Sequence, residues 1–455
     1  MVTTGARPIG PVDAIWLNMD RPNNLMVIDA LLWLHEPITR ARLGEVVRQR
    51  LVERYPVFRQ RPVPGGAPSA SGWTRRHWEE DPEFALDRHV RRARLRPPGD
   101  DAALHHFVDA RLSRPFDRRH PLWEIHLIDG YGSGAVVLAR MHHALADGVA
   151  LAQVLLSLTD ASVGSDGGVA DPPRPAAPAR GPADTVAAGI SLVRRYATPR
   201  GLVEVLALAR QAGGVVGKLV LGSNPATPLS GRPGVAKHAV WSAPRPLQPV
   251  KTLGKMTGAT VNDVLVCAVA GGLSRYLAEH GSPPVDLTTM VPVNLRPQGV
   301  PLPAELGNRF ALVLLELPSG RWPVLARLAE TKRRMDAIKH SPEAAITFGL
   351  ISAIGRATPY VDQPLVDFFS SKAFGVTTNV AGPTTERSLA GSQVDSVLGW
   401  VPGSGDQGVG VSIVTYNGTV RLGFKVDAVI VPDPDRLVAA AEASLDELLR
   451  ITRNA

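Results

Sequence analysis

One short segment, which joins a β-type run to a helical run, constrains this chain more than any other. Residues 135–139, Ala-Val-Val-Leu-Ala, form an apolar run typical of a strand. Further along, apolar residues recur at helical spacing, at Val149, Leu151, Val154, Leu155 and Leu158. The sequence therefore predicts a strand that leads directly into a helix. Residues 141–148, Met-His-His-Ala-Leu-Ala-Asp-Gly, lie at this junction, and α/β proteins usually place their chemistry at strand ends.

The junction holds His142, His143, Asp147 and Gly148 at fixed offsets, in the pattern H-H-x-x-x-D-G. A neutral imidazole can accept a proton from an alcohol. We expect Asp147 to orient a ring or to fix the turn, and Gly148 to allow a sharp bend of the backbone. The structural alternative is two core histidines beside an aspartate that caps a helix. The combination of all four residues favours a catalytic site.

Length and composition indicate a folded protein of more than one domain. The chain has 455 residues, of which 44% are hydrophobic and 20% charged, so it can bury a large core. Its one cysteine, Cys267, lies in an apolar helical run and cannot form an intrachain disulfide. We interpret Cys267 as a buried structural thiol.

The formal net charge of +8 favours anionic membranes or phosphate-bearing ligands as partners. Basic runs such as residues 91–94 and 332–334 are typical of solvated faces, and no nucleic-acid motif accompanies them. The first ten residues lack the apolar core of a signal peptide. The nearest approach to a membrane span, residues 202–221, is interrupted by charges. The sequence therefore predicts a cytoplasmic protein, or one attached peripherally to a membrane from the cytoplasmic side.

The clearest break in the chain lies at residues 161–184, which are rich in Pro, Gly, Ala and Asp and show no hydrophobic period. We interpret this stretch as a flexible linker. Residues 185–222 regain helical character and could form a connector or touch a bilayer. The sequence thus predicts an N-terminal unit at 1–160, a linker and connector at 161–234, and a C-terminal unit at 235–455.

Strands and helices are expected in both halves. The expected strands are residues 25–34, 123–128, 288–293, 310–317, 373–380, 409–416 and 419–426. The expected helices include residues 104–112, 260–280, 322–340, 344–357 and 435–450. Asn417-Gly418 lies between two β-type runs and predicts a tight hairpin. These patterns indicate a mixed α/β protein with two halves, and they do not determine its topology.

Several further motifs follow the histidine pair in a recognisable order. They are residues 121–124 (PLWE) upstream, and 262–263 (ND), 291–296 (VPVNLR), 307–310 (GNRF) and 378–383 (TNVAGP) downstream. The segment HHALADG resembles the HHxxxDG motif of the CoA-dependent acyltransferase superfamily. Together the motifs resemble the bacterial wax ester synthase/diacylglycerol acyltransferase family, actinobacterial type. The resemblance runs from Pro11 almost to the C-terminus.

The resemblance implies two chloramphenicol acetyltransferase-like lobes with the active-site channel between them. It implies an acyl-CoA-dependent O-acyltransferase that makes triacylglycerol from diacylglycerol, with long-chain alcohols as a further acceptor for wax esters. In that family His143 would be the general base, and His142 a structural neighbour. Asp147 would turn away from the substrate and pair with Arg296.

Three further residues are candidates for substrate contact or oxyanion stabilisation by the same resemblance. Asn379 resembles the segment that lines the channel near the thioester, although a turn residue before Gly-Pro is the alternative. Asn262 and Asp263 occupy a family motif, but both lie in the first turn of an expected helix capped by Thr260. Helix capping could explain that pair equally well.

We find no G-x-S-x-G nucleophile elbow, and Cys267 lies away from the other motifs. Direct attack on the thioester is therefore preferred to an acyl-enzyme. No cofactor and no metal are expected, and acyl-CoA enters as a co-substrate. The alternatives are a polyketide-lipid acyltransferase, a condensation-type enzyme of the same fold, and a non-catalytic lipid-inclusion protein. We expect peripheral contact with the inner face of the plasma membrane or with lipid inclusions.

Overall fold

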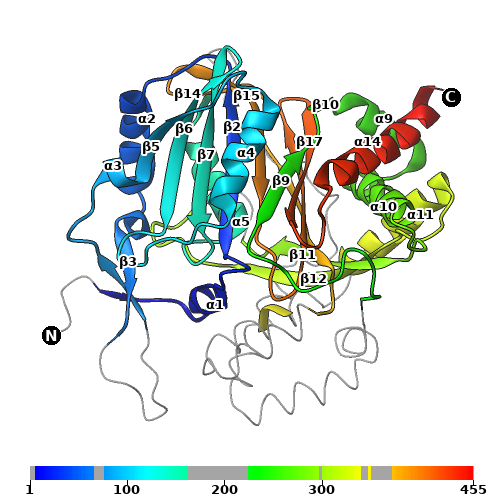
Figure 1. Cartoon of the computed structure of the whole chain (residues 1–455), viewed down its shortest axis with the longest axis horizontal. Coiled ribbons are helices and arrows are strands. Elements are labelled where there is room, and N and C mark those ends of the chain that lie inside the picture. The colour runs from blue at the N-terminus through cyan, green and yellow to red at the C-terminus, as the bar shows by residue number, and fades with distance from the viewer. Residues whose placement is uncertain are drawn as a thin grey trace, which may run out of the picture.

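The computed structural model describes residues 6–65, 76–161, 224–296, 300–339, 347–349 and 371–453. Two lobes lie side by side, each built on a seven-stranded sheet (Figure 1). The expected mixed α/β architecture with two lobes is confirmed. The predicted linker at 161–184 and the predicted connector at 185–222 lie almost entirely outside the described residues.

The first lobe contains the junction on a mixed sheet with the strand order β5-β6-β7-β2-β15-β14-β8. Its strands are β2 (Val27–Leu34), β5 (Val90–Arg94), β6 (Trp123–Tyr131), β7 (Gly134–His142), β8 (Asp160–Ala161), β14 (Arg387–Leu389) and β15 (Ser392–Trp400). Its helices are α1 (Pro11–Met19), α2 (Arg40–Val47), α3 (Leu86–His89), α4 (Asp101–Leu112) and α5 (Gly148–Ser157). A small sheet of β1 (Arg7–Pro8), β4 (His77–Glu80) and β3 (Gln60–Val63) completes it.

The second lobe has the strand order β10-β17-β16-β13-β11-β12, with β9 also paired to β17. Its strands are β9 (Lys237–Trp241), β10 (Arg245–Pro246), β11 (Leu287–Asn294), β12 (Phe310–Leu317), β13 (Gly375–Ala381), β16 (Val409–Tyr416) and β17 (Thr419–Asp427). Its helices are α9 (Gln248–Thr257), α10 (Val261–Glu279), α11 (Val324–Lys339) and α14 (Pro434–Arg450). These four helices gather on the side of the sheet that faces away from the first lobe (Figure 1).

Two strands from the C-terminal half belong to the sheet of the first lobe. β15 pairs antiparallel with β2 along most of its length, from Val394 opposite Leu34 to Trp400 opposite Asp29. β14 then bridges β15 to β8. The predicted boundaries at residues 161 and 235 divide the chain by sequence. The sheet of the first lobe, however, also contains strands that come from after residue 235. Local periodicity cannot reveal this exchange, because it does not specify which edge a strand will join.

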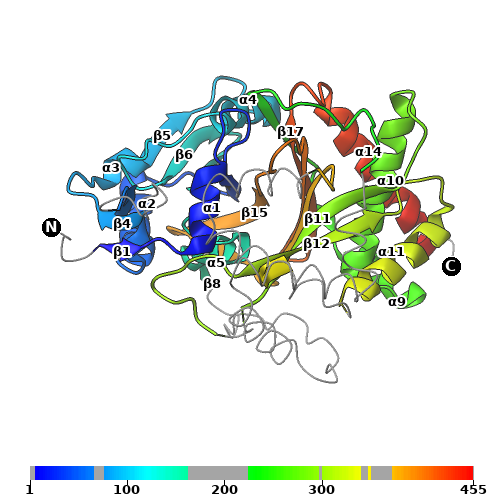
Figure 2. The same ribbon diagram turned by 90° about the horizontal axis from the view of Figure 1, so that it is seen from below.

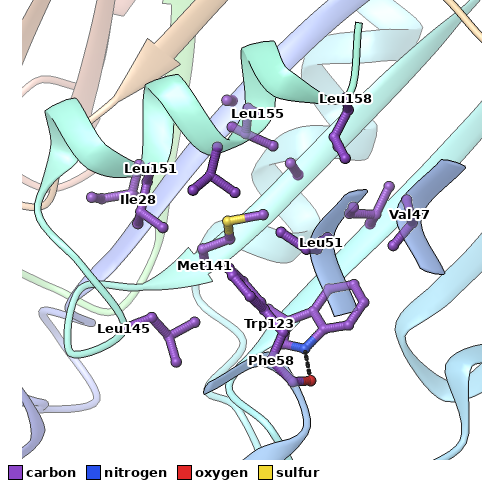
Figure 3. Packing of buried hydrophobic residues seen from close by; sticks show 14 of the residues in the cluster. Ile28, Val47, Leu51, Phe58, Trp123, Met141, Leu145, Leu151, Leu155 and Leu158 are labelled. Carbon is purple, nitrogen blue, oxygen red and sulfur yellow. Dashed lines mark hydrogen bonds between the residues drawn. The ribbon is translucent and has the colours of Figure 1, made fainter. Parts of the chain in front are cut away.

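The core of the first lobe forms where α5 packs on the sheet. Leu151 and Leu155 of α5, and Leu158 directly after it, lie in one buried cluster with Met141 and Trp123, as the helical spacing of the sequence predicts (Figure 3). Trp123 is 1% exposed and donates its indole N–H to the carbonyl of Phe58 at 2.9 Å. This packing holds the helix, and with it the junction, firmly against the end of β7.

A buried ionic cluster joins the two sheets beneath the site. Asp29 on β2 is fully buried and accepts from Arg140 of β7 at 3.0 Å and from Lys425 of β17 at 2.7 Å. Arg140 also bonds Glu124 at 2.7 Å. Removal of Asp29 would leave two cations with little access to water, so the three charges lock β2, β7 and β17 in one arrangement.

Several local predictions are confirmed. Thr260 and Asp263 form a reciprocal capping box at the start of α10, and Gly281 follows the helix with a φ of 68°. Asn417 and Gly418 have φ values of 42° and 74° and connect β16 to β17. Only residues 347–349 of the helix expected at 344–357 are described, and they are helical.

One helix in the described part of the chain, α10, is long and apolar enough to cross a membrane by length and composition alone. However, 78% of its apolar window is buried inside the protein, where α10 packs against α9, α11 and α14. The core helix of a globular lobe has the same properties. The interrupted segment at 202–221 lies outside the described residues.

Candidate active site

The junction forms a tight turn between β7 and α5. β7 ends at His142, and Asp147 caps α5 by accepting the backbone N–H of Ala150 at 2.9 Å. The turn is also bound to the neighbouring strand, since the N–H of His143 donates to the carbonyl of Met26 at 2.8 Å. The predicted passage from strand to helix is confirmed, and it places the two histidines in different surroundings.

His142 faces the interior of the first lobe and is 1% exposed. Its Nδ1 accepts the N–H of Ala144 at 3.0 Å, so the ring proton of a neutral His142 must be on Nε2. Nε2 in turn lies 3.0 Å from Asp20 Oδ2. Burial acts to raise the pKa of Asp20, but the hydrogen bond from His142 and further donors outweigh it and lower that pKa. With both nitrogens engaged, His142 is suited to hold the turn in place.

His143 instead lines a cavity between the lobes. Its ring stacks on Trp16 at a centroid distance of 3.9 Å, with an angle of 22° between the planes. Nδ1 lies 3.0 Å from Oδ1 of Asn308. Burial lowers the pKa of His143 to about 4, although the charge of Asp147 acts in the opposite direction. The imidazole is therefore neutral near pH 7 and able to accept a proton.

Asn308 connects His143 to a buried carboxyl group on α1. Its Nδ2 donates to Asp13 Oδ1 at 2.7 Å and to the carbonyl of His143 at 2.9 Å. The backbone N–H of Asn308 also donates to Asp13 Oδ1, at 2.9 Å. Burial raises the pKa of Asp13 to about 6. Seen from below, α1 lies at the join between the two lobes (Figure 2).

Asp13, Trp16 and Asn308 were not among the predicted site residues. Asn308 belongs to the motif GNRF and Asp13 stands where the family resemblance begins, so both were visible only as motif positions. Nothing local indicates that residues 165 positions apart will meet. Only the folded structure, which brings Asn308 to His143, indicates a role for Asn308.

Asp147 both caps α5 and pairs across the lobes. Its Oδ2 accepts from Arg296 Nη2 at 2.7 Å and from the backbone N–H of Arg309 at 2.9 Å. Arg296 also donates to the carbonyl of Gly307. The side chains of Asp147 and Arg296 are 3% and 9% exposed. The structure thus places the two residues together as the resemblance implied. Asp147 supports the turn through these bonds, and it is also among the residues that line the cavity.

The reason expected for Gly148 is wrong. Its backbone does not have a positive φ, because Gly148 is the first residue of α5. A Cβ atom there would lie 3.6 Å from Val401 and 3.9 Å from Ile28, which are ordinary contacts. Gly148 instead lines the cavity beside His143 and adds no side chain to its wall.

The three candidate substrate-contact residues separate into two groups. Asn379 lines the cavity and donates its amide N–H to Oδ1 of Asn262 at the start of α10. Asp263 is fully buried, and its Oδ2 accepts the N–H of Thr260 at 2.8 Å. It is not among the residues that line the cavity. The geometry therefore favours helix capping for Asp263 and leaves Asn379 as a candidate for contact with substrate. Asn262 is not among the cavity-lining residues either, and it reaches the site only through its hydrogen bond with Asn379.

The cavity encloses about 1340 Å³, counted to its open mouth, and both lobes contribute to its walls. Its apolar lining includes Ile28, Leu32, Leu155, Leu312, Val376, Trp400 and Val401. The polar residues of its lining include His143, Asp147, Asn294, Thr378 and Asn379. A largely apolar cavity with a few polar groups near one imidazole is suited to a lipid-like ligand. Among the described residues, no group of three or more His, Cys, Asp or Glu side chains could hold a metal ion.

Two family models match this sequence in order. The model of the wax ester synthase/diacylglycerol acyltransferase catalytic domain matches residues 9–265, and the model of the C-terminal domain of the same family matches residues 306–449. A probable diacylglycerol O-acyltransferase of Mycobacterium tuberculosis is 27% identical over 409 residues, covering 87% of this chain and 84% of its own length. A putative diacylglycerol O-acyltransferase of the same organism is 29% identical over 432 residues, covering 89% of each chain.

Solved structures of low sequence identity share the fold. The wax ester synthase/diacylglycerol acyltransferase from Marinobacter aquaeolei VT8 matches with a TM-score of 0.69 and 22% identity, covering 97% of this chain and 98% of its own. The first condensation domain of the calcium-dependent antibiotic synthetase matches with a TM-score of 0.61 and 15% identity, covering 98% and 96% of the two chains. The two-lobed arrangement is therefore shared with enzymes of different substrates.

Proposed function

Since the chain belongs to the wax ester synthase/diacylglycerol acyltransferase family and is an acyltransferase, we propose that it transfers a long-chain acyl group from CoA to diacylglycerol. Long-chain alcohols are the second acceptor class. The observation that carries the proposal is a buried, neutral His143 beside an apolar cavity between the lobes. The mycobacterial relatives named as diacylglycerol O-acyltransferases support diacylglycerol as the acceptor.

In the proposed reaction His143 is the general base. Its Nε2 takes the proton of the acceptor hydroxyl while the hydroxyl oxygen attacks the thioester carbonyl. The tetrahedral intermediate then collapses and the carbon–sulfur bond breaks. The leaving thiolate takes the proton from His143 to give CoA, which restores the neutral imidazole. The products are the ester and CoA, and no residue is acylated.

The surroundings of Cys267 support direct attack. Cys267 lies in the core of the second lobe, and it is not among the residues that line the cavity. Burial raises the pKa of its thiol to about 11, so the nucleophilic thiolate is scarce near neutral pH. Asn379 and its partner Asn262 are the candidates for positioning the thioester or for stabilising the oxyanion.

The acceptor requires the enzyme to reach a membrane or a lipid inclusion, because diacylglycerol resides in lipid. We infer a cytoplasmic enzyme in peripheral contact with such a surface, supported by the formal net charge of +8. Acyl-CoA is the co-substrate, and its phosphates would be bound by basic residues that the proposal does not identify.

The test uses purified protein, palmitoyl-CoA and a panel of acceptors in mixed micelles. The panel contains dioleoylglycerol, hexadecanol, short water-soluble alcohols and amines. Release of CoA is followed with and without acceptor, and lipid products are resolved by chromatography. We expect triacylglycerol as the main product and a smaller yield of wax ester. Acylation of only the short alcohols or amines would contradict the proposal and favour a polyketide-lipid or condensation-type enzyme.

A further inference from the structure

We propose that Asn308, held in place by Asp13, is a positioning residue that fixes His143 in the tautomer required of a general base. In that tautomer Nδ1 carries the proton and Nε2 has the free lone pair. The inference rests on the proposed function of His143. It adds a relay of three side chains, Asp13, Asn308 and His143, drawn from α1, from the segment before β12 and from the junction.

The first step is the orientation of the Asn308 amide. Nδ2 lies 2.7 Å from Asp13 Oδ1 and 2.9 Å from the carbonyl oxygen of His143. Both neighbours are acceptors, so the amide atom between them must be the one that donates. A flipped amide would place an oxygen against two oxygens. The orientation of Asn308 is therefore set by its partners, and Oδ1 is the atom that faces the imidazole.

The second step assigns the proton on the ring. Asn308 Oδ1 can only accept a hydrogen bond, and it lies 3.0 Å from Nδ1 of His143. A hydrogen bond forms at this distance only when Nδ1 carries the proton. Nε2 of the neutral ring is then unprotonated, as proton abstraction from a hydroxyl requires. The opposite tautomer would place two lone pairs in contact and would leave no basic nitrogen for the substrate.

The third step explains how Asn308 resists rotation. Asp13 Oδ1 accepts from Nδ2 and also from the backbone N–H of Asn308, so the same oxygen holds both ends of the residue. Asp13 is 7% exposed and Asn308 is 8% exposed, which keeps water from competing for these bonds. Trp16, three residues after Asp13, stacks on the His143 ring and limits its tilt. The base is thus correctly set only when α1 and the segment before β12 meet at the junction.

The direct test requires no substrate. Protein labelled with ¹⁵N histidine is measured by long-range ¹H–¹⁵N correlation near pH 7.5, and the His143 signals are assigned by their loss in His143→Gln. We expect the Nδ1-protonated tautomer in the wild type. The Nε2-protonated tautomer in the wild type would overturn the inference, whatever the enzyme acylates.

The second test is kinetic and compares two variants of the same residue. Asn308→Leu removes the acceptor, and we expect kcat to fall by about 10–100-fold with KM for both substrates unchanged, since losses of this order follow removal of an orienting partner. Asn308→Asp retains an oxygen toward Nδ1 but places its other oxygen against Asp13 and the His143 carbonyl, so we expect it to keep the tautomer in the spectra without restoring kcat. Asn23→Leu is the matched control, because the amide of Asn23 donates to the backbone carbonyl of Pro233 at 3.3 Å and Asn23 does not line the cavity.

The outcomes separate this inference from the proposed function. A wild type without acyl transfer activity would contradict the function and leave the tautomer measurement valid. An active wild type with a folded Asn308→Leu variant of normal kcat would overturn the relay alone. If Asn308→Leu does not fold, an Asn308→Asp variant that folds and shows the Nε2-protonated tautomer in the same spectra would overturn it.

Discussion

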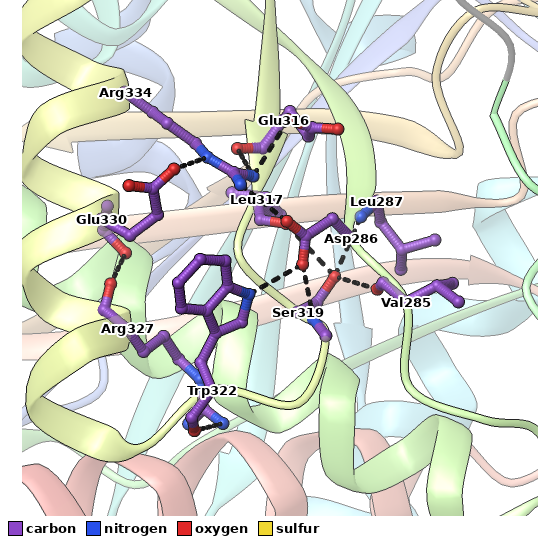
Figure 4. A network of polar contacts seen from close by, with 12 residues as sticks. Val285, Asp286, Leu287, Glu316, Leu317, Ser319, Trp322, Arg327, Glu330 and Arg334 are labelled. Atoms are coloured by element: carbon purple, nitrogen blue, oxygen red, sulfur yellow. Dashed lines mark hydrogen bonds and ion pairs between the residues drawn. The ribbon is translucent and has the colours of Figure 1, made fainter.

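The two lobes each contain a network of buried or half-buried ion pairs, and the two networks differ in what they connect. At the junction, Asp147 of the first lobe pairs with Arg296, which follows β11 of the second lobe. Behind the second lobe, Arg334 on α11 gathers the carboxylates of Asp286, Glu316 and Glu330 (Figure 4). The first network crosses between lobes beside the cavity, whereas the second lies within one lobe.

The Arg334 network stabilises the packing of α11 against the sheet. Arg334 lies 2.7 Å from Asp286 Oδ2 and 2.7 Å from Glu330 Oε1. Asp286 Oδ1 also accepts the indole N–H of Trp322 at 3.0 Å and the N–H of Gly320 at 2.8 Å. None of these residues lines the cavity. The comparison teaches that similar ion pairs serve different purposes, since one supports the turn that carries His143 and the other supports a helix.

The largest effect is expected from the junction itself. His143→Ala removes the proposed base, and we expect acyl transfer to fall by about 10²–10⁴-fold, the usual contribution of general base catalysis. Activity is measured as acceptor-dependent CoA release, and folding by circular dichroism. His142→Ala does not serve as a control because it disturbs the turn. A folded His143→Ala variant with near-normal turnover would refute the mechanism.

The pH dependence sharpens the contrast between the networks. Burial lowers the pKa of His143 to about 4, so the neutral base is present above that pH and is lost as pH falls through it. In the other network, hydrogen bonds from Arg333 and Arg334 lower the pKa of Glu330 to about 2, so it stays ionised. We expect kcat/KM to be flat above roughly pH 7, and to fall at lower pH first as Asp13, whose pKa is raised to about 6, is protonated and then as His143 is protonated. A protonated His143 imidazole at pH 6.5 in the ¹⁵N histidine spectra would contradict this environment.

Loss of one partner in the junction pair should reduce both stability and activity. Asp147→Asn and Arg296→Ala each leave a buried polar or charged group without its partner, at a cost of about 3–5 kcal/mol in the free energy of unfolding. Arg296→Ala should also lower kcat, since the turn that carries His143 loses a support. The measurements are thermal unfolding and transfer assays. Unchanged melting of both variants would show that the pair does not hold the lobes together.

A matched change in the Arg334 network should reduce stability alone. Arg334→Gln removes the charge shared by three carboxylates, and we expect a loss of about 1–3 kcal/mol in the free energy of unfolding. Transfer activity at a temperature where the variant stays folded should equal that of the wild type. A lower kcat in the folded variant would mean that this network also reaches the active site, which would break the comparison.

The smallest effect is expected at Gly148. Its backbone conformation suits alanine, and an added Cβ would make only ordinary contacts. Gly148→Ala should therefore increase the free energy of unfolding by about 0.4–1 kcal/mol. The added methyl group narrows the cavity beside the base. We therefore expect a modest fall in the rate with palmitoyl-CoA and a smaller fall with short acyl-CoA. Strong destabilisation of Gly148→Ala would show that the backbone at this position requires glycine.

Much of the site could be predicted from the sequence because the residues of the junction are close to one another in the chain. The strand that ends at His142, the cap at Asp147 and the helix that follows all lie within a few residues of one another. Hydrophobic periodicity and capping chemistry act over such distances. The same reasoning located α10 with its Thr260 cap and the hairpin at Asn417-Gly418.

The failures have a common physical cause. β15 has the alternating burial of an ordinary strand, yet its partner β2 lies in the other half of the chain. β5 forms where no strand was expected, although Arg91, Arg92 and Arg94 are exposed, as the interpretation of the basic run as a solvated face predicts. Gly148 was assigned a conformational role because glycine so often has one. In each case the structure of the segment depends on which distant part of the chain packs against it, and the local sequence does not contain that information.

The same division holds for the chemistry. Hydrogen bonds within one turn, such as that from Ala150 to Asp147, depend only on neighbours in the chain and can be derived from residue types. The surroundings that make His143 neutral, stack it on Trp16 and join it to Asn308 arise when α1 and the second lobe close around it. In a folded protein the tautomer of a buried imidazole is set by the partner that meets one of its nitrogens. The amino-acid order thus determines where His143 lies in the chain, and docking of distant segments determines which partner each of its nitrogens meets.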